Sequence, residues 1–147
     1  MSDANTVLHA IFDANRLLRE AGEKLASTAG QTHARRMVLQ AAEDGATVPD
    51  IARKLGLHRQ GIQRITDELV ADALGHYVDN PRHRQSKLFI VTDQGSAALS
   101  DIHTAHTRWV DGIEAEVTGI DWRALNSALG ELMRVLRDQA ERSTGSA

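Results

Sequence analysis

The chain has 147 residues, of which 41% are hydrophobic, 3% are aromatic and none is cysteine, and its formal net charge is −3 at pH 7. This length suits one domain or one compact fold with an extension, and the lack of cysteine excludes disulfides, thiolate metal sites and a cysteine redox switch. The chain has no run of about 18 apolar residues and no signal-peptide pattern at its start, which predicts a cytoplasmic protein that does not enter a membrane.

The N-terminal segment, residues 3–26, predicts a long helix. Its apolar residues alternate between intervals of four and three, the spacing of a coiled-coil seam. They are Val7, Ile11, Ala14, Leu18, Ala21 and Leu25. A second helix is expected at about 32–44, where Thr32 is placed to cap its first turn.

Residues 47–73 predict a helix-turn-helix. A capping-box variant at 47–50 opens a short helix, and Gly56 ends it just before the next helix starts. In that second helix, 58–73, the residues Ile62, Ile65 and Leu69 repeat at helical spacing. Gly75 is expected to end it. A motif of this kind presents its second helix to the major groove of duplex DNA.

A basic hairpin is expected directly after the helix-turn-helix. Residues 76–78 predict one strand and residues 87–91 its partner, with Leu88 and Ile90 on one face. The turn between them, 80–86, is polar and basic and opens with Asn-Pro. A two-stranded hairpin with a basic tip in this position is typical of the wing of a winged helix.

Two further helices are predicted at about 93–117 and from Asp121 onward. Both carry apolar residues at intervals of three and four, including Leu99, Ile102 and Trp109 in the first and Leu125 and Leu129 in the second. Together with the N-terminal helix they form three seams that the small central module cannot cover. A homodimer would cover them, and it would place two recognition helices about one DNA turn (~34–36 Å) apart.

The charge is unevenly distributed. Residues 51–92 hold seven of the seventeen Lys and Arg and only four of the twenty Asp and Glu, and 51–66 and 80–92 contain no acid. A local basic surface on an acidic body suits a DNA-binding module, because attraction to phosphate acts over about 8–10 Å in physiological salt. The alternative is a basic face that is simply solvated.

The stretches VPDIARKLGLHRQGIQRITDELVADALGHYVDNPRHRQSK and LFIVTDQG resemble the MarR family of winged-helix transcriptional regulators. The resemblance implies a mainly α homodimer in which helices of 1–30 and 93–147 form the dimerisation region and 31–92 the winged helix-turn-helix. It also implies recognition helices in the major groove of operator DNA and wings in the minor groove. Many members are repressors that a small, often phenolic, ligand releases from DNA.

Two departures from the family pattern bear on the DNA contacts. His58 stands where Ser or Thr often starts the recognition helix. The wing run 80–85 has neither the two acids nor one of the arginines of the usual Asp-x-Arg-Asp-x-Arg, so the salt bridge that normally braces the wing loses its partners and the tip becomes more positive.

The predicted DNA-binding residues lie on the two helices and the wing. They are Arg53, Lys54, His58, Arg59, Gln60, Gln63, Arg64, Arg82, Arg84 and Lys87. Gln pairs with adenine and Arg with guanine in the major groove, whereas Arg84, or Arg82, is expected in a narrow minor groove. Arg53 and Lys54 are expected on phosphate, which gives affinity without sequence information.

A pocket for a small ligand is expected to have apolar walls and a few polar groups. Its candidate residues are His9, Phe12, Arg16, His33, Arg36, Tyr77, His106 and Trp109, and the alternative for His106 is a structural role in the core or at the dimer interface. A zinc-responsive regulator using His33, His103 and His106 with Glu20 or Glu23 is a second hypothesis. A winged module that binds protein instead of DNA is a third.

An enzyme is not predicted. The chain contains no glycine-rich phosphate loop, no cysteine nucleophile and no G-x-S-x-G motif. No cofactor is predicted either.

Overall fold

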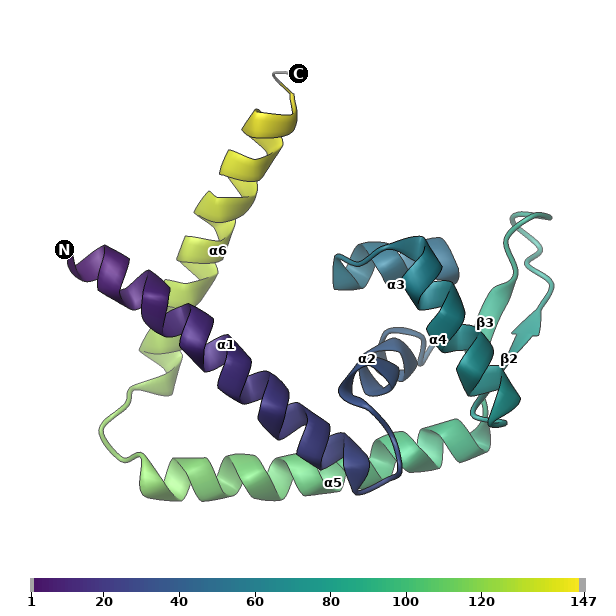
Figure 1. The fold of residues 1–147 in the computed structure, drawn as a ribbon, viewed down its shortest axis with the longest axis horizontal. Coiled ribbons are helices and arrows are strands. Elements are labelled where there is room, and N and C mark those ends of the chain that lie inside the picture. Colours follow the sequence, from purple (N-terminus) through teal and green to yellow (C-terminus); the bar gives the residue numbers. More distant parts are fainter. Residues whose placement is uncertain (1, 146–147) are drawn as a thin grey trace. The chain divides into compact units, whose positions relative to one another are not determined.

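The computed structural model describes residues 2–145 (Figure 1). In chain order its elements are α1 (Asp3–Ser27), α2 (His33–Ala41), β1 (Ala46–Thr47), α3 (Val48–Leu55), α4 (Arg59–Ala71), β2 (Gly75–Val78), β3 (Leu88–Val91), α5 (Asp93–Glu116) and α6 (Trp122–Thr144). This order confirms the predicted mainly α winged helix-turn-helix, with the helix-turn-helix in α3 and α4 and the wing in β2 and β3.

The starts of α2, α3 and α6 are fixed by local side-chain caps, as the sequence predicted. The side chains of Thr32, Thr47 and Asp121 each accept a hydrogen bond from the backbone N–H three residues further on. These contacts satisfy donors that the first turn of a helix leaves without a partner. At the end of α3, Gly56 takes the left-handed conformation with φ 65°, which glycine adopts without strain.

The sheet has three strands in the order β1-β3-β2, all antiparallel, so the expectation of a two-stranded hairpin was incomplete. Ala46 and Thr47 pair with Phe89 and Leu88 on the far side of β3. The extended backbone of Thr47, which the capping of α3 requires, also lets this short segment join the edge of β3. The added strand ties the start of the helix-turn-helix to the wing.

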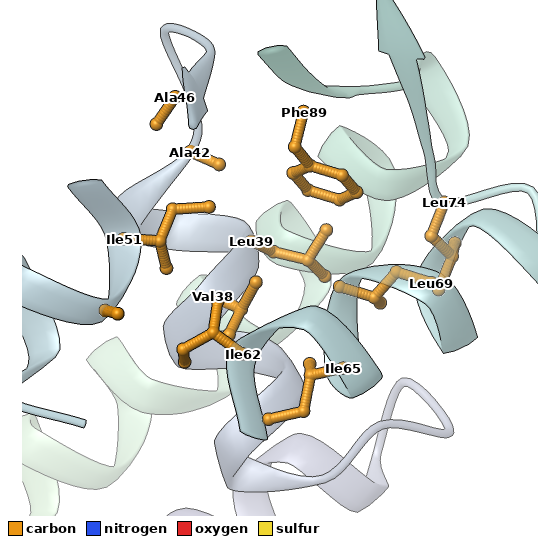
Figure 2. Close-up of a cluster of buried hydrophobic side chains, with 11 residues drawn as sticks. Val38, Leu39, Ala42, Ala46, Ile51, Ile62, Ile65, Leu69, Leu74 and Phe89 are labelled. Atoms are coloured by element: carbon orange, nitrogen blue, oxygen red, sulfur yellow. The ribbon is translucent and has the colours of Figure 1, made fainter. Parts of the chain in front are cut away.

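The core lies where α2, α3 and α4 pack against the sheet (Figure 2). Its buried residues are Val38, Leu39, Ala42, Ala46, Ile51, Ala52, Ile62, Ile65, Leu69, Leu74 and Phe89. Phe89 is fully buried and its ring meets that of Tyr77 edge to face, with centroids 5.9 Å apart. Leu88 and Ile90 do lie together on one face of β3, but the fully buried side chain of the strand is Phe89 on the other.

The end of α4 differs from the prediction that Gly75 would stop it. The helix ends at Ala71, and Ala73 supplies the left-handed residue, with φ 62°. Gly75 instead opens β2 beneath the ring of Phe89, where a Cβ atom would lie 2.3 Å from two ring carbons. Gly75 is therefore needed for close packing of strand and ring.

The chain divides into two compact units, the first extending to Arg108 and the second beginning at Trp109. This boundary falls inside α5. The division into a dimerisation region, 1–30 and 93–147, and a DNA-binding region, 31–92, stays a prediction. None of the helices within residues 2–145 is long and apolar enough to cross a membrane.

Candidate nucleic-acid interface

Helix α4 is held from one side and exposed on the other. Ile62, Ile65 and Leu69 are buried against the core. Arg35 on α2 donates from Nη2 to Oδ2 of Asp72 at 2.6 Å, and its side chain is only 16% exposed, so this ion pair anchors the C-terminal end of α4. The opposite face is exposed and carries Arg59, Gln60, Gln63 and Arg64. The structure therefore presents the predicted recognition residues on one free helix face.

The start of α4 lacks the usual cap. His58 occupies the N-cap position in extended conformation, and its side chain forms no capping hydrogen bond. The backbone N–H groups of the first turn and the exposed imidazole are therefore available to an anion, which the positive end of a helix favours.

The predicted cations differ in whether an acid neutralises them. Arg53 pairs with Asp50, and Arg64 pairs with Glu68 at 2.9 Å. The ammonium of Lys54 donates to the carbonyl of Ala41 at 3.2 Å, so it caps the end of α2. Four others, Arg59, Arg82, Arg84 and Lys87, form no ion pair within residues 2–145. Those four lie at the start of α4 and on the wing.

The tip of the wing is ordered by backbone and amide contacts. Oδ1 of Asn80 accepts from the N–H of Arg82 at 3.0 Å, and its carbonyl accepts from the N–H of His83 at 3.2 Å. Asn80 thus closes the turn at the tip of the wing. Arg82 and Arg84 remain exposed, and the segment that carries them extends away from the sheet (Figure 1).

A groove of about 540 Å³ runs between α4 and the wing. Its walls are Val48 and Pro49 from α3, Arg59, Gln60 and Gln63 from α4, and Tyr77, Gln85, Ser86 and Lys87 from the wing and its base. Three of the four predicted recognition residues and one wing cation thus share a single concave surface. Gln85 and Ser86 also line the groove, and no pattern in the sequence had singled them out.

A hydrogen-bond network joins α4 to β2 at the floor of this groove. The hydroxyl of Tyr77 donates to Oδ1 of Asp67 at 2.6 Å and contacts Oγ1 of the buried Thr66 at 2.7 Å. Nε2 of Gln63 donates both to Tyr77 Oη and to Asp67 Oδ1, each at 3.0 Å. Burial and the bond to Asp67 raise the pKa of Tyr77 to about 12. Tyr77 therefore stays protonated and links the recognition helix to the wing.

A second cavity, of about 550 Å³, lies between α2 and the first half of α5. Its walls are Arg36, Gln40, Glu43, Asp44, Ser96, Leu99, Ser100 and His103. Of the predicted ligand residues only Arg36 lines it. Tyr77 lies in the other groove, Arg16 pairs with Glu20 on the exposed surface of α1, and His33 packs against Gly22. The predicted set is thus not gathered in one cavity of the first unit, and its role in ligand binding stays a prediction.

His106 lies near Arg36, and its pKa is lower than the usual 6.5 because burial, followed by the charges of Arg36 and His103, disfavours the imidazolium. The unfolded chain then binds the proton more tightly than the folded one, so the free energy of unfolding should fall as the pH drops below about 6.5. We expect His106→Gln to weaken this dependence, measured as urea midpoints at pH 7.5 and 5.5. The exposed His9→Gln variant is the control, and an unchanged pH dependence in His106→Gln would contradict the assignment.

The residues of the zinc hypothesis are not assembled into a site. Among residues 2–145 no group of three or more His, Asp and Glu side chains is arranged to hold a metal ion. Glu23 accepts a hydrogen bond from the backbone N–H of His33 at 3.2 Å, which is a helix-start contact and not a ligand set.

Comparison with known proteins gives relatives in sequence and in structure, although no family model matches. The Mycobacterium tuberculosis protein Rv2011c is 42% identical over 104 residues, which are 69% of this chain and 73% of that protein. The MarR family transcription regulator SP03579 superposes with a TM-score of 0.81 at 24% identity, covering 95% of both chains.

Two further solved structures include a bound molecule. MosR from M. tuberculosis, in complex with DNA, has a TM-score of 0.71 at 20% identity and covers 89% of this chain and 96% of its own. CouR from Rhodococcus jostii, bound to p-coumaroyl-CoA, has a TM-score of 0.70 at 22% identity, with coverage of 91% and 92%. At these identities the likeness concerns the fold.

Proposed function

We propose that this chain, which belongs to one family with Rv2011c and has the fold of the MarR family of transcriptional regulators, is a dimeric, sequence-specific DNA-binding regulator. It would repress transcription and be released from its operator by a small ligand. It would act in the cytoplasm, where the chromosome lies. We propose no catalytic activity for this chain.

The observation that carries this proposal is a set of four cations without acidic partners among residues 2–145. Arg59 and Lys87 line the groove between α4 and the wing, and Arg82 and Arg84 lie on the wing. Within the same module Arg35, Arg53 and Arg64 are paired with Asp72, Asp50 and Glu68. Cations kept free of acids on one surface suit a polyanion, because each phosphate contact releases a condensed counterion. MosR, which shares the fold, was solved in complex with DNA.

The dimer is proposed from the apolar residues that a single chain leaves exposed. On α1 the side chains of Phe12 and Leu18 are 74% and 56% exposed, and on α6 Trp122, Leu125 and Leu136 are also exposed. Patches of this kind mark interfaces in folded proteins. A two-fold dimer would also give two α4 helices for two half-sites of a palindrome.

The ligand is proposed to be a small molecule, as in CouR, which was solved with p-coumaroyl-CoA. A phenolic compound is the first class to screen. Such a ligand would release the operator only if it binds more tightly to a dimer whose recognition helices are wrongly spaced for DNA.

Selection of bound sites from random duplexes, followed by mobility shifts at several salt concentrations, tests the proposal. We expect recovery of a palindromic site and an affinity that falls steeply with salt. Failure to enrich any sequence, with no shift at low salt, would favour a winged module that binds protein. Screening small phenols for release of the selected site then tests the ligand.

Arg84→Ala is expected to weaken binding to all duplexes alike. Loss of one phosphate contact should lower the slope of log affinity against log salt by about 0.9. A charge-assisted hydrogen bond contributes roughly 1.5 kcal/mol, so the affinity should fall about tenfold at low salt. Fluorescence anisotropy titrations of the selected site and of unrelated duplexes measure both effects.

Two further variants serve as a control and as a contrast for Arg84→Ala. Arg142→Ala removes an exposed arginine from α6, far along the chain from the groove residues, and should leave both affinity and slope unchanged. Gln60→Ala should instead reduce the preference for the selected site while keeping the salt slope. An Arg84→Ala protein with unaltered salt slope would remove the wing from the proposed contact surface.

A further inference from the structure

The groove between α4 and the wing carries one cation on each of two walls. Arg59, the first residue of α4, lies on one wall, and Lys87, the residue before β3, lies on the other. Both side chains are exposed, and neither forms an ion pair among residues 2–145. Arg64, on the same helix, does not line the groove and is paired with Glu68. The unpaired arginine of α4 is thus the one that lines the groove.

The other side chains that line this groove are uncharged. Val48 and Pro49 give it an apolar wall, and the remaining uncharged side chains are amide and hydroxyl groups that can donate a hydrogen bond. The nearby carboxylate of Asp67 accepts hydrogen bonds from Tyr77 and Gln63. These walls suit an occupant that combines negative charge with apolar surface. A sugar–phosphate strand has this composition, because each charged phosphate is followed by the apolar carbons of a sugar.

We propose that the groove holds one sugar–phosphate strand of the duplex, with a single phosphate between Arg59 and Lys87. The inference rests on the proposed function, which places α4 in the major groove and the wing in the minor groove of DNA. One strand separates these two grooves of a duplex, so it passes between the two elements, where the groove of the protein lies. The volume of about 540 Å³ is in the range of roughly 300–1,000 Å³ that holds molecules of drug size, such as one nucleotide.

The role of Arg59 changes with this placement. Helical spacing alone groups it with the residues that read bases, where an arginine would pair with guanine. A phosphate contact instead gives affinity without sequence information. The start of α4 suits an anion, because the positive end of the helix lies there and no side chain caps it. Sequence preference then depends on the other exposed residues of α4.

A scan with methylphosphonates tests this site, because each one removes the charge of a single phosphate. The scan uses the duplex recovered by site selection, with one substitution at a time in one half-site. The proteins are wild type, Arg59→Gln, Lys87→Gln and the double variant. A charged phosphate forms stronger hydrogen bonds than a neutral one, by about fivefold in affinity for each cation. At the phosphate in the groove we expect binding to weaken about 25-fold in wild type, about fivefold in each single variant and less than about twofold in the double variant.

The matched control is Arg84→Gln. It removes a wing cation that is exposed and does not line the groove. This variant should bind more weakly overall but keep the effect of about 25-fold at the same phosphate. Arg59 and Lys87 are exposed too, so their replacement should leave the melting temperature unchanged, which circular dichroism checks.

Site selection with Arg59→Gln separates phosphate binding from base reading. We expect weaker binding to every duplex, a salt slope lower by about 0.9, and the base preferences of wild type at all positions. Loss of a preference for guanine at one position would mean that Arg59 reads a base, and it would overturn the inference.

Two further results would overturn the inference while leaving DNA binding intact. One is that Arg59→Gln and Lys87→Gln lose sensitivity at different phosphates. The other is a double variant as sensitive as wild type to every methylphosphonate. A wild-type protein that binds no duplex at any salt concentration would instead overturn the proposed function together with the inference.

Discussion

Phe89→Ala is expected to lower the free energy of unfolding by about 3–5 kcal/mol, because the change removes a fully buried ring and leaves a cavity that the surroundings fill only in part. For a domain of this size that corresponds to a fall in melting temperature of roughly 2–4 °C for each kcal/mol. Urea denaturation followed by circular dichroism measures the loss.

The position of Phe89 explains why the effect should be large. It lies on β3, the central strand of the sheet, and its ring covers Gly75 and meets the ring of Tyr77. Figure 2 shows it directed toward Leu39 in the middle of the buried cluster. The same ring therefore supports the sheet, α2 and, through Tyr77, the recognition helix.

A conservative variant at this position tests how much of the stability loss comes from the missing apolar volume. Phe89→Leu keeps most of the apolar volume, so it should lose less than half as much stability as Phe89→Ala. Measurements at two protein concentrations separate the stability of the fold from that of a dimer. A loss below about 1 kcal/mol for Phe89→Ala would mean that Phe89 is not a central core residue.

The helices and their starts were predictable because their signals are local. Thr32, Thr47 and Asp121 each cap the helix that follows within three residues, and the apolar repeats of α4 lie within one helix. Non-local pairing was harder to foresee. Strand β1 is two residues long and pairs with Phe89 and Leu88, more than forty positions away, so no local pattern in the sequence predicted it.

The sequence pattern also did not indicate which face of β3 enters the core. Its residues 88–91 are all apolar, so alternation could not distinguish the buried side from the half-buried one. The neighbouring strand decides the question. Gly75 leaves room for a ring on one face only, and Phe89 occupies that room.

The candidate site was predictable in its residue types and only partly in its arrangement. The exposed face of α4 follows from helical spacing, and the pairing of Gln63 with Asp67 follows from their separation of four. The third partner, Tyr77, comes from a different element and was grouped in the sequence with Arg36 as a ligand residue. Only the packing of β2 on α4 places it beside Gln63.

Leu18→Asp is expected to convert the proposed dimer to a monomer. Leu18 belongs to the seam predicted on α1, and its side chain is 56% exposed in the single chain, so an interface there would bury it. A carboxylate at the same place would lose its hydration without gaining a partner. Sedimentation velocity at micromolar protein should show about half the wild-type mass.

Loss of the dimer should also reduce DNA binding strongly. Two linked recognition modules bind a two-half-site duplex about 10²- to 10⁴-fold more tightly than one module does, provided that both can engage. We expect Leu18→Asp to lose affinity within that range on the palindrome, but to bind a duplex with a single half-site about as well as wild type. Anisotropy titrations on the two duplexes separate these effects.

The matched control is Leu57→Asp, which places the same charge at a leucine that is 54% exposed in the turn before α4 and outside the predicted seam. It should remain a dimer, so a monomer in both variants would indicate general destabilisation. A wild-type protein that is already monomeric at micromolar concentration would contradict the dimer. So would a Leu18→Asp protein that keeps the dimer mass, because the exposed apolar residues of α1 would then need another explanation.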